Sequence, residues 1–496
     1  MLTNKTVVLG ITGGIAAYKA ADLASKLTQA GAKVETIMTE SATKFTTPLT
    51  LRNITGRPVV TDMFELASEF KVEHVALADA ADVVVIAPAT ANIIAKIAAG
   101  IADDMLTCAV LATKAPIIVA PSMDANMWEN SITQQNINKL KGRGFTIIDP
   151  KHGYLASGKT GMGRLADTEK IMGTIKQVLG RSGDLAEKRI VVTAGGTQEP
   201  IDPVRHISNR SSGKMGYAIA EAARDRGAIV SLIAAPTSLT DPAGMDVTHV
   251  ETAAQMKEAV EKAVAQADAL IMAAAVADYQ PKTTAKTKIK RATPSLTLEL
   301  VRTPDILAEV KGNFLRVGFA AESENLVANA RQKLEKKQLD LIVANDITDP
   351  TCAFGSDTNK VTTIDRKGKA EDLPLMSKRE VAERIMERVA ELLPPRPKFE
   401  VTVAKAWIDH HLIHIPARYK SLFPSVNTTL QLDTDIDVIE ARLNVNTYDL
   451  GPKKDGLHAW YEAHRELKPR DKLIIEVIER DKKYRLEVVR WQKEVR

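Results

Sequence analysis

The sequence predicts an α/β protein with two parallel-sheet domains followed by a small, mostly-β module. Three observations support this prediction. Continuous Val/Ile runs alternate with amphipathic segments over residues 5–180, and a second cycle of the same kind begins near residue 190. After residue 397 the composition changes, because three of the four Trp and five of the nine His lie there. A chain of 496 residues is too long to fold around one hydrophobic core, and its length is typical of about three domains.

The first predicted domain, residues 1–180, contains five strands. Their uninterrupted apolar character indicates burial on both faces, which is typical of parallel strands covered by helices. We therefore expect a Rossmann-like or flavodoxin-like domain. The predicted strands are Thr6–Leu9, Val34–Met38, Asp82–Ala87, Ile117–Ala120 and Phe145–Ile148.

A plausible linker at 180–187 leads to the second predicted domain, residues 186–394, which repeats this pattern. Ser377 and Glu380 form a capping-box pattern that starts a helix, and the stiff segment Leu393–Pro397 ends the domain. The predicted strands are Ile190–Thr193, Ile229–Ile233, Ala269–Met272, Arg316–Phe319 and Leu341–Ala344. The third predicted unit is a mostly-β module over residues 398–496, with strands at 401–403, 412–416, 472–478 and 484–489.

Bulk composition excludes several classes of protein. The net charge of +5 is small for this length, so it predicts binding neither to nucleic acid nor to a membrane surface. The chain starts directly with a strand, without a signal sequence, and no apolar run reaches the ~18 residues of a membrane span. Cys108 and Cys352 have neither metal nor disulfide spacing, which predicts a cytoplasmic location.

Three turns follow strand ends in the first domain. Gly10–Lys19 contains two adjacent glycines, and Met38–Phe45 and Ala87–Asn92 carry further small or hydroxyl residues. Ligands of open parallel sheets bind past these strand ends. A tight βα turn without a ligand explains the first turn equally well, but the three together predict a phosphorylated cofactor.

This region resembles the flavin-dependent cysteine decarboxylase family through Gly10–Lys19, His74-Val-Ala-Leu and Pro121–Trp128. The resemblance implies FMN as cofactor, reversible hydride transfer from the cysteine β-carbon, loss of CO₂, and His74 as the acid/base residue. A lone His is more often structural, and the surrounding motifs alone select this one. The residues that the resemblance assigns to FMN are Gly13, Gly14, Thr39, Ala89, Thr90, Asn92 and Met127.

Two positions depart from the family pattern. Asp124 stands where the family has an Asn that holds the substrate carboxylate, and an ionised Asp would repel that group; Asn126 is a candidate for compensation. Ser157 stands where the family's mobile flap carries a Cys, and a hydroxyl lacks the acidity and redox chemistry of a thiol. We therefore expect decarboxylation to persist while the final reduction slows or uses another donor.

Gly153–Thr160 is a literal match to the phosphate-binding pattern GxxxxGK[ST]. In that motif the Lys-Thr pair opens a helix, which places backbone N–H groups against the phosphates. Here Gly161-Met-Gly163 follows, which disfavours a helix, and the preceding strand ends several residues too early. We interpret this segment as the flap rather than as an ATPase site.

The segment Thr193–Gly216 carries two Gly-Gly or Ser-Ser-Gly clusters, two Pro, Asn209 and a Lys between a strand and a helix. It resembles the signature of the phosphopantothenate–cysteine ligase family, and further matches follow in order at 273–279, 288–290, 303–307, 318–322, 333–337 and 344–346. The resemblance implies CTP as co-substrate, an acyl-cytidylate intermediate, and displacement of CMP by cysteine.

Activating a carboxylate with a nucleoside triphosphate requires cations for the polyphosphate and donors for the developing charge. Asn209 would hold the intermediate and Lys288 would be catalytic, with a divalent cation, Mg²⁺, on the phosphates. Any one of these lysines could simply lie on a solvated helix face. Seven motif matches in the same order as in the family are not explained in that way. The residues assigned to the nucleotide are Ala273, Ala274, Asp278, Lys288, Pro304, Asp305, Ile306, Leu307, Phe319, Lys333 and Lys337.

The last 100 residues extend beyond the bifunctional family that joins these two activities. The pattern Ile413-His-Ile-Pro with Leu467–Asp471 loosely resembles plant B3-type DNA-binding pseudobarrels, but the balance of 19 Lys+Arg against 16 Asp+Glu over residues 396–496 is too small to establish DNA binding. His410, His411 and His414 complete no metal pattern, and a solvated or core role is favoured. A role in assembly is equally open.

We expect a bifunctional coenzyme A biosynthesis enzyme with an appended β module. The resemblance implies a homo-oligomer with trimeric decarboxylase contacts, where the active sites lie, and dimeric ligase contacts. The rival hypothesis is a ligase fused to a regulatory flavoprotein that has lost decarboxylase activity and binds a protein partner; Asp124 and Ser157 keep it open. A further hypothesis, binding to nucleic acid, rests only on the C-terminal module.

Overall fold

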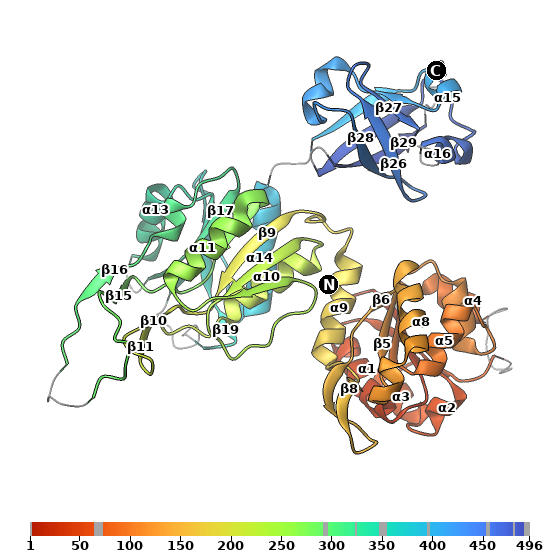
Figure 1. Cartoon of the computed structure of the whole chain (residues 1–496), viewed down its shortest axis with the longest axis horizontal. Helices are drawn as coiled ribbons and strands as arrows, with labels where there is room; N and C mark the ends of the chain where they lie inside the picture. Colours follow the sequence, from red (N-terminus) through yellow and green to blue (C-terminus); the bar gives the residue numbers. More distant parts are fainter. Residues whose placement is uncertain are drawn as a thin grey trace. The chain divides into compact units, whose positions relative to one another are not determined.

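The computed structural model describes residues 2–63, 73–290, 296–322, 325–346, 355–393, 397–452, 457–479 and 482–490 (Figure 1). The chain divides into two compact units, Met1–Leu392 and Leu393–Arg496. The predictions that concern Cys352, Trp491 and residues 394–396 lie outside the described residues. Among the helices that are described, none is both long and apolar enough to cross a membrane.

The first domain is a six-stranded parallel sheet in the order β3-β2-β1-β4-β5-β6, which confirms the predicted parallel sheet and its five strands and adds the short edge strand β3. One hydrophobic core lies against α1, α3 and α9, and a second lies against α5, α6 and α8, so both faces of the sheet are covered. The strands are β1 (Thr6–Ile11), β2 (Lys33–Met38), β3 (Val59–Val60), β4 (Val83–Ala89), β5 (Ile117–Pro121) and β6 (Thr146–Ile147). The helices are η1 (Ile15–Tyr18), α1 (Lys19–Gln29), α2 (Glu40–Thr43), α3 (Pro48–Thr55), α4 (Glu73–Ala80), α5 (Ala91–Ala99), α6 (Met105–Ala112), α7 (Ala125–Glu129), α8 (Ser131–Gly142) and α9 (Thr168–Gly180).

The second domain is an eight-stranded sheet in the order β13-β12-β9-β14-β17-β18-β20-β21. The five predicted strands are present and parallel, but β20 runs antiparallel to both of its neighbours, β18 and β21, so the sheet is mixed. The strands are β9 (Arg189–Ala194), β12 (Ile229–Ala234), β13 (Asp246–His249), β14 (Ala269–Met272), β17 (Leu315–Glu322), β18 (Leu341–Asp346), β20 (Val361–Asp365) and β21 (Ala370–Asp372). The helices are α10 (Lys214–Asp225), α11 (Ala253–Ala263), η2 (Val264–Gln266), α12 (Ile306–Glu309), α13 (Leu326–Lys336) and α14 (Lys378–Leu392).

Short two-stranded ribbons extend from this sheet. They pair β10 (Gln198–Pro200) with β11 (His206–Ser208), β15 (Tyr279–Pro281) with β16 (Leu300–Arg302), and β19 (Thr358–Asn359) with β22 (Met376–Ser377). The predicted capping box of α14 is confirmed: Ser377 N donates to Glu380 Oε2 at 2.9 Å, and Glu380 N donates to Ser377 Oγ at 3.2 Å. These bonds satisfy backbone donors that the first helical turn leaves unpaired.

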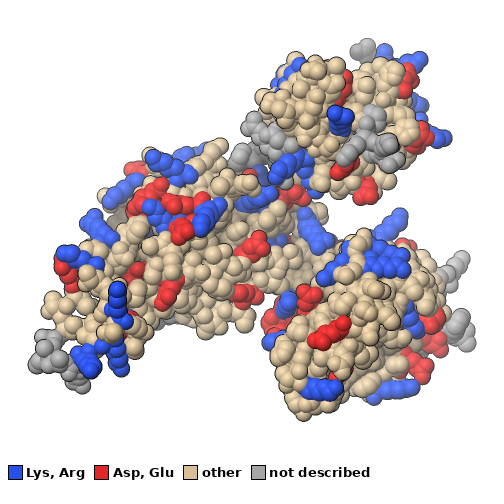
Figure 2. All heavy atoms as spheres, viewed as in Figure 1, with Lys and Arg blue, Asp and Glu red and all other residues tan. Residues whose placement is uncertain are grey.

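The C-terminal unit is a mostly-β half-barrel with the strand order β23-β28-β29-β25-β26-β27-β24. Its core is built around Trp460 and Tyr484, both fully buried. The elements are β23 (Lys398–Thr402), α15 (Lys405–His410), β24 (Ile413–His414), η4 (Ala417–Leu422), β25 (Thr428–Asp433), β26 (Val438–Asn444), β27 (Asp449–Pro452), α16 (Leu457–Ala463), β28 (Lys472–Glu479) and β29 (Lys483–Val489). Figure 2 shows both basic and acidic side chains on each part of the chain in view, in line with the small net charge.

Asp435 links two aromatic side chains of this module, and its replacement by Ala is expected to weaken the module. His464 Nε2 lies 2.9 Å from Asp435 Oδ2, and the indole N–H of buried Trp460 donates to Oδ1 at 3.2 Å. Burial opposes ionisation of Asp435, but these two bonds outweigh it and hold the pKa of the carboxyl below its ordinary value. Losing the acceptor of a buried donor costs about 1–2 kcal/mol.

Urea unfolding followed by tryptophan fluorescence measures this loss, with Asp409→Ala on α15 as the control. Because the folded pKa of Asp435 is depressed, its contribution is present above the unfolded pKa and disappears as the pH falls through the folded pKa. Wild type and variant should therefore differ at neutral pH and converge in acid. An equal loss in Asp409→Ala would contradict the assignment.

Candidate functional site

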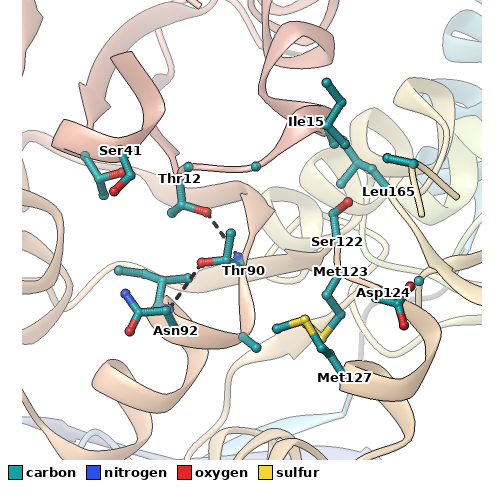
Figure 3. A pocket seen from close by; sticks show the side chains of 18 of the residues that line it. Thr12, Ile15, Ser41, Thr90, Asn92, Ser122, Met123, Asp124, Met127 and Leu165 are labelled. Carbon is teal, nitrogen blue, oxygen red and sulfur yellow. Dashed lines mark hydrogen bonds between the residues drawn. The ribbon is translucent and has the colours of Figure 1, made fainter. Parts of the chain in front are cut away.

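A cavity of about 930 Å³ lies at the carboxyl ends of the parallel strands of the first domain. Its walls come from the turns after β1, β2, β4 and β5 and from a hairpin made by β7 (Lys151–Tyr154) and β8 (Thr160–Arg164). The strand-end position is where open parallel sheets bind their ligands. The three turns selected from the sequence therefore surround one cavity (Figure 3).

Hydroxyl side chains hold these turns together. Thr12 Oγ1 donates to Pro88 O at 2.7 Å and accepts from Thr90 N at 3.1 Å, which ties the first turn to the third (Figure 3). Thr90 in turn caps α5 by accepting from Ile93 N, and Thr39 caps α2 by accepting from Ala42 N at 3.3 Å. These bonds fix the first and third turns beside the N-terminus of α5, a position that suits a phosphate ester.

Gly13 lies too close to the second turn for any other residue. A Cβ on Gly13 would come within 2.3 Å of Ser41 Cβ and 2.8 Å of the Ser41 backbone, whereas a Cβ on Gly14 would meet only Thr90 Cγ2, at 3.5 Å. Gly13→Ala is therefore expected to destabilise the flavin-free protein by about 1–3 kcal/mol. Thermal unfolding measures this effect, and Gly14→Ala is the matched control. Equal melting temperatures for the two variants would show that the second turn accommodates a Cβ at position 13 without a loss of stability.

Most residues assigned to the cofactor line this cavity. Gly13, Gly14, Thr39, Thr90, Asn92 and Met127 are in its wall. Ala89 is fully buried in β4, one residue before Thr90, and is not among the residues that line the cavity. His74 is half-buried on α4 and is also not among them. Within one chain, the structure does not bring His74 to the cavity.

The hairpin lines one side of the cavity and brings Ser157 into contact with Asp124, the two positions that depart from the family pattern. Ser157 Oγ donates to Asp124 Oδ2 at 2.6 Å, and Asn126 N donates to Oδ1 at 3.0 Å. The bond from Ser157, followed by the bond from Asn126, lowers the pKa of the Asp124 carboxyl. An ionised carboxylate thus faces the cavity at neutral pH. The prediction that 153–160 is no ATPase loop is confirmed, because Lys159 and Thr160 lead into β8 and not into a helix.

In the second domain the signature segment meets the downstream motifs at the strand ends. Ala275 N donates to Gly195 O at 2.8 Å, and Ala277 N donates to Thr197 Oγ1 at 2.9 Å. The Asn209 amide, which is exposed, donates to Val276 O at 3.0 Å. These bonds place Asn209 beside the Ala273–Asp278 segment, so residues almost 70 positions apart form one site.

Two of the three assigned lysines, Lys333 and Lys337, contact the downstream motifs of this domain. Lys333 Nζ donates to Phe319 O at 2.7 Å, and Lys337 Nζ donates to Asp305 Oδ1 at 3.0 Å. Thr303 N donates to Asp278 O at 3.1 Å, which joins Asp278 to the segment that contains Pro304, Asp305, Ile306 and Leu307. Lys288 is exposed on the connection between β15 and β16. Among the described residues, no cluster of three or more His, Cys, Asp or Glu could hold a metal ion.

Comparison with known proteins gives the same two-part division. A family model described as "Flavoprotein" matches residues 1–180, and one described as "DNA/pantothenate metabolism flavoprotein C-terminal domain" matches residues 185–393. The coenzyme A biosynthesis bifunctional protein CoaBC of Bacillus subtilis (strain 168) is 46% identical over 398 residues, which cover 79% of this chain and 98% of the relative. The chain belongs to the CoaBC family.

The CoaBC protein of Escherichia coli (strain K12) is 42% identical over 395 residues, with 78% of this chain and 97% of the relative covered. A crystal structure of the C-terminal domain of a CoaBC protein is 42% identical, covers 43% of this chain and 98% of its own, and gives a TM-score of 0.37. Both family models end by residue 393, so the half-barrel module lies beyond the matched part of this CoaBC chain.

Sequence reasoning missed one residue that positions the ligase half of this CoaBC chain. Asp202 is buried and accepts from Val204 N and Arg205 N, both at 2.9 Å, and from Ile289 N at 3.1 Å. The bond from Arg205 lowers the pKa of the Asp202 carboxyl far below its ordinary value, so the group is ionised. Through its bond from Ile289 N, the Asp202 carboxylate holds the backbone next to Lys288 in place. The spacing Asp202-Pro-Val-Arg205 is a turn signal that could have identified it.

Proposed function

We propose that this chain catalyses two successive steps of coenzyme A biosynthesis. The second domain joins cysteine to 4′-phosphopantothenate with CTP, and the first domain decarboxylates the product to 4′-phosphopantetheine. The observation that carries the proposal is the presence of both candidate sites in one chain, which matches the Bacillus subtilis CoaBC protein over 79% of this chain and 98% of the relative.

In the ligation step the phosphopantothenate carboxylate attacks the α-phosphorus of CTP and releases pyrophosphate, and the cysteine amine then displaces CMP from the acyl-cytidylate. The Asn209 amide, which donates to Val276 O through one N–H, would donate to the intermediate through the other. Lys288, Lys333 and Lys337 supply positive charge to the phosphates. Mg²⁺ would bind to the polyphosphate, since the described residues offer no carboxylate cluster of their own.

In the decarboxylation step the cysteine carboxylate leaves as CO₂, and a proton takes its place. FMN fits the first-domain cavity, where Gly13 permits the close approach of two turns and hydroxyls face the ligand; when bound, it supplies reversible hydride transfer. The residues that would hold it are Gly13, Gly14, Thr39, Thr90, Asn92 and Met127. His74 would act as acid/base from a neighbouring subunit in a trimer, since it does not reach its own cavity. The ligase half would form dimers.

The contact between Ser157 and Asp124 favours a second candidate, a ligase whose flavoprotein half is impaired as a decarboxylase and binds a protein partner. One preparation separates the two. The purified full chain should show flavin absorbance, release CMP when given phosphopantothenate, CTP and cysteine, and release CO₂ from phosphopantothenoylcysteine. CMP release without CO₂ would support the second candidate, and the absence of both would refute the proposal.

A further inference from the structure

Helix α9 is the last element of the first domain, and two of its faces pack against different parts of the chain. Gly173, Gln177 and Gly180 follow one another at helical spacing, so they share one face of α9. Both glycines on this face are buried. The other packed face belongs to the apolar core of the first domain and comprises Ile171, Ile175 and Val178.

The glycine-containing face of α9 contacts the second domain within the compact unit Met1–Leu392. Gln177 Nε2 donates to Gly244 O at 3.1 Å. A Cβ on Gly173 would lie 3.3 Å from Arg224 Nη1 and 3.5 Å from Ala243 Cβ. The three atoms nearest to such a Cβ all belong to the second domain. The absence of a side chain at this position therefore permits the close approach of α9.

The surface that α9 meets is fixed by a buried ion pair at the end of α10. Arg224 and Asp225 are both buried, and Arg224 Nε and Nη2 donate to Asp225 Oδ1 at 2.8 and 2.6 Å. Arg224 Nη1 donates to Ala243 O at 2.7 Å, and Arg379 Nη2 on α14 donates to Asp225 Oδ2 at 2.8 Å. A buried ion pair is tolerated when further hydrogen bonds satisfy both partners, as they do here. The guanidinium beside Gly173 is thus held in one position.

The connection that follows α9 is bonded to the same region of the second domain. Leu185 N donates to Arg226 O at 3.1 Å. Glu187 N donates to Gly227 O at 3.3 Å, also at the end of α10. Arg226 Nε donates to Asp184 Oδ1 at 2.9 Å. The connection therefore reinforces the contact of α9 with the second domain.

Helix α9 is also continuous with the wall of the first-domain cavity. Arg164 and Leu165, at the end of β8, line the cavity, and α9 begins shortly afterwards at Thr168. Thr168 Oγ1 donates to Asp22 Oδ2 at 2.7 Å, which joins the start of α9 to α1. A ligand that orders this wall therefore acts on a helix that contacts both domains.

We propose that α9 couples the stability of the two catalytic domains, so that flavin bound in the first domain stabilises the second domain. The inference rests on the proposed function, which places FMN in the first-domain cavity. A ligand that binds only the folded form stabilises every element that unfolds together with its site. Because α9 contributes to the core of one domain and to a packed surface of the other, unfolding of the first domain removes a contact from the second.

The test compares the full-length protein with and without FMN through two measurements. The midpoint temperature for loss of CMP release reports on the ligase half. Hydrogen exchange of peptides from α10 and from the loop Ala243–Gly244 reports on the contact and requires no activity. At about a hundredfold excess over its Kd, FMN should raise the midpoint by about 5 °C and slow exchange in both peptides.

Gly173→Leu places a large side chain between α9 and the second domain and should abolish both effects of FMN on the second domain. Flavin binding and CMP release at low temperature should persist in this variant. Gly142→Leu on α8 is the matched control, because a Cβ on that helical glycine meets nothing within 4 Å. Gln177→Ala removes only the bond to Gly244 and should weaken both effects of FMN, which provides a second variant if the first does not fold.

Two outcomes would overturn the inference. In the first, FMN raises the unfolding temperature of its own domain but changes neither the CMP-release midpoint nor the exchange of α10. In the second, Gly173→Leu responds to FMN as the wild type does. Failure of the proposed function has a different signature, because the wild type would then bind no flavin or release no CMP. Ligand-free exchange still decides the contact in that case: it should be faster at Ala243–Gly244 in Gly173→Leu than in Gly142→Leu, and equal rates would refute the contact.

Discussion

Asn209→Ala is expected to reduce CMP release about 10²- to 10³-fold, the usual cost of removing one donor that stabilises a developing charge. The Asn209 amide is fixed across the site by Val276 O, and its loop is joined to the Ala273–Asp278 segment by three further backbone and hydroxyl bonds. The loss should appear in kcat, since a donor that acts mainly on the intermediate contributes little to ground-state binding.

The chain provides its own control for this experiment. Decarboxylation of added phosphopantothenoylcysteine takes place in the other domain and should proceed at the wild-type rate in Asn209→Ala. Pyrophosphate release separates the two half-reactions and shows whether acyl-cytidylate formation or its use by cysteine is affected. CMP release at the wild-type rate would remove Asn209 from the reaction.

The second large effect concerns the departures at Asp124 and Ser157. Asp124→Asn is expected to raise kcat/KM for decarboxylation about tenfold, because it removes a like charge facing an anionic substrate. The lowered pKa of Asp124 keeps that charge in place at neutral pH. As the pH falls through this pKa the wild-type carboxyl becomes neutral, so the difference between wild type and variant should shrink in acid.

Ser157→Cys addresses the final reduction. A thiol in the hairpin restores a group that can assist reduction of the enethiol, so the fraction of saturated product should rise relative to CO₂ released. Mass spectrometry of the products measures this ratio, and Ser157→Ala is the control that only removes the bond to Asp124. Stoichiometric saturated product at normal turnover, unchanged in Ser157→Ala, would show that this position does not limit the reduction.

The elements that could be predicted are those whose pattern is local. Buried parallel strands read as continuous Val/Ile runs, and every such run forms a strand in the structure. The strands that were missed have a weaker pattern: β20 is a fully buried strand in which Thr362, Thr363 and Asp365 interrupt the apolar run, and β25 and β26 alternate buried with exposed residues. Such interrupted or half-exposed strands depend on the strands they pair with, and that pairing is not evident from the sequence.

The same limit applies to the sites. Glycine-rich turns at strand ends could be found because the backbone requires those residue types. The contact between Ser157 and Asp124 could not, because 33 residues separate them and the hairpin alone brings them together. Lys19 and Lys96 both line the cavity, but the sequence does not show that Lys96 is paired with Asp103 and Asp104.

The half-barrel module draws every member of its apolar core from residues 399–488. A core that is complete in itself makes unfolding a sum of separate transitions rather than one cooperative event. Damage within the module, such as a cavity at Trp460, would then lower the melting of this unit alone. Substitutions in this core are therefore expected to act first on the stability of the module that contains them.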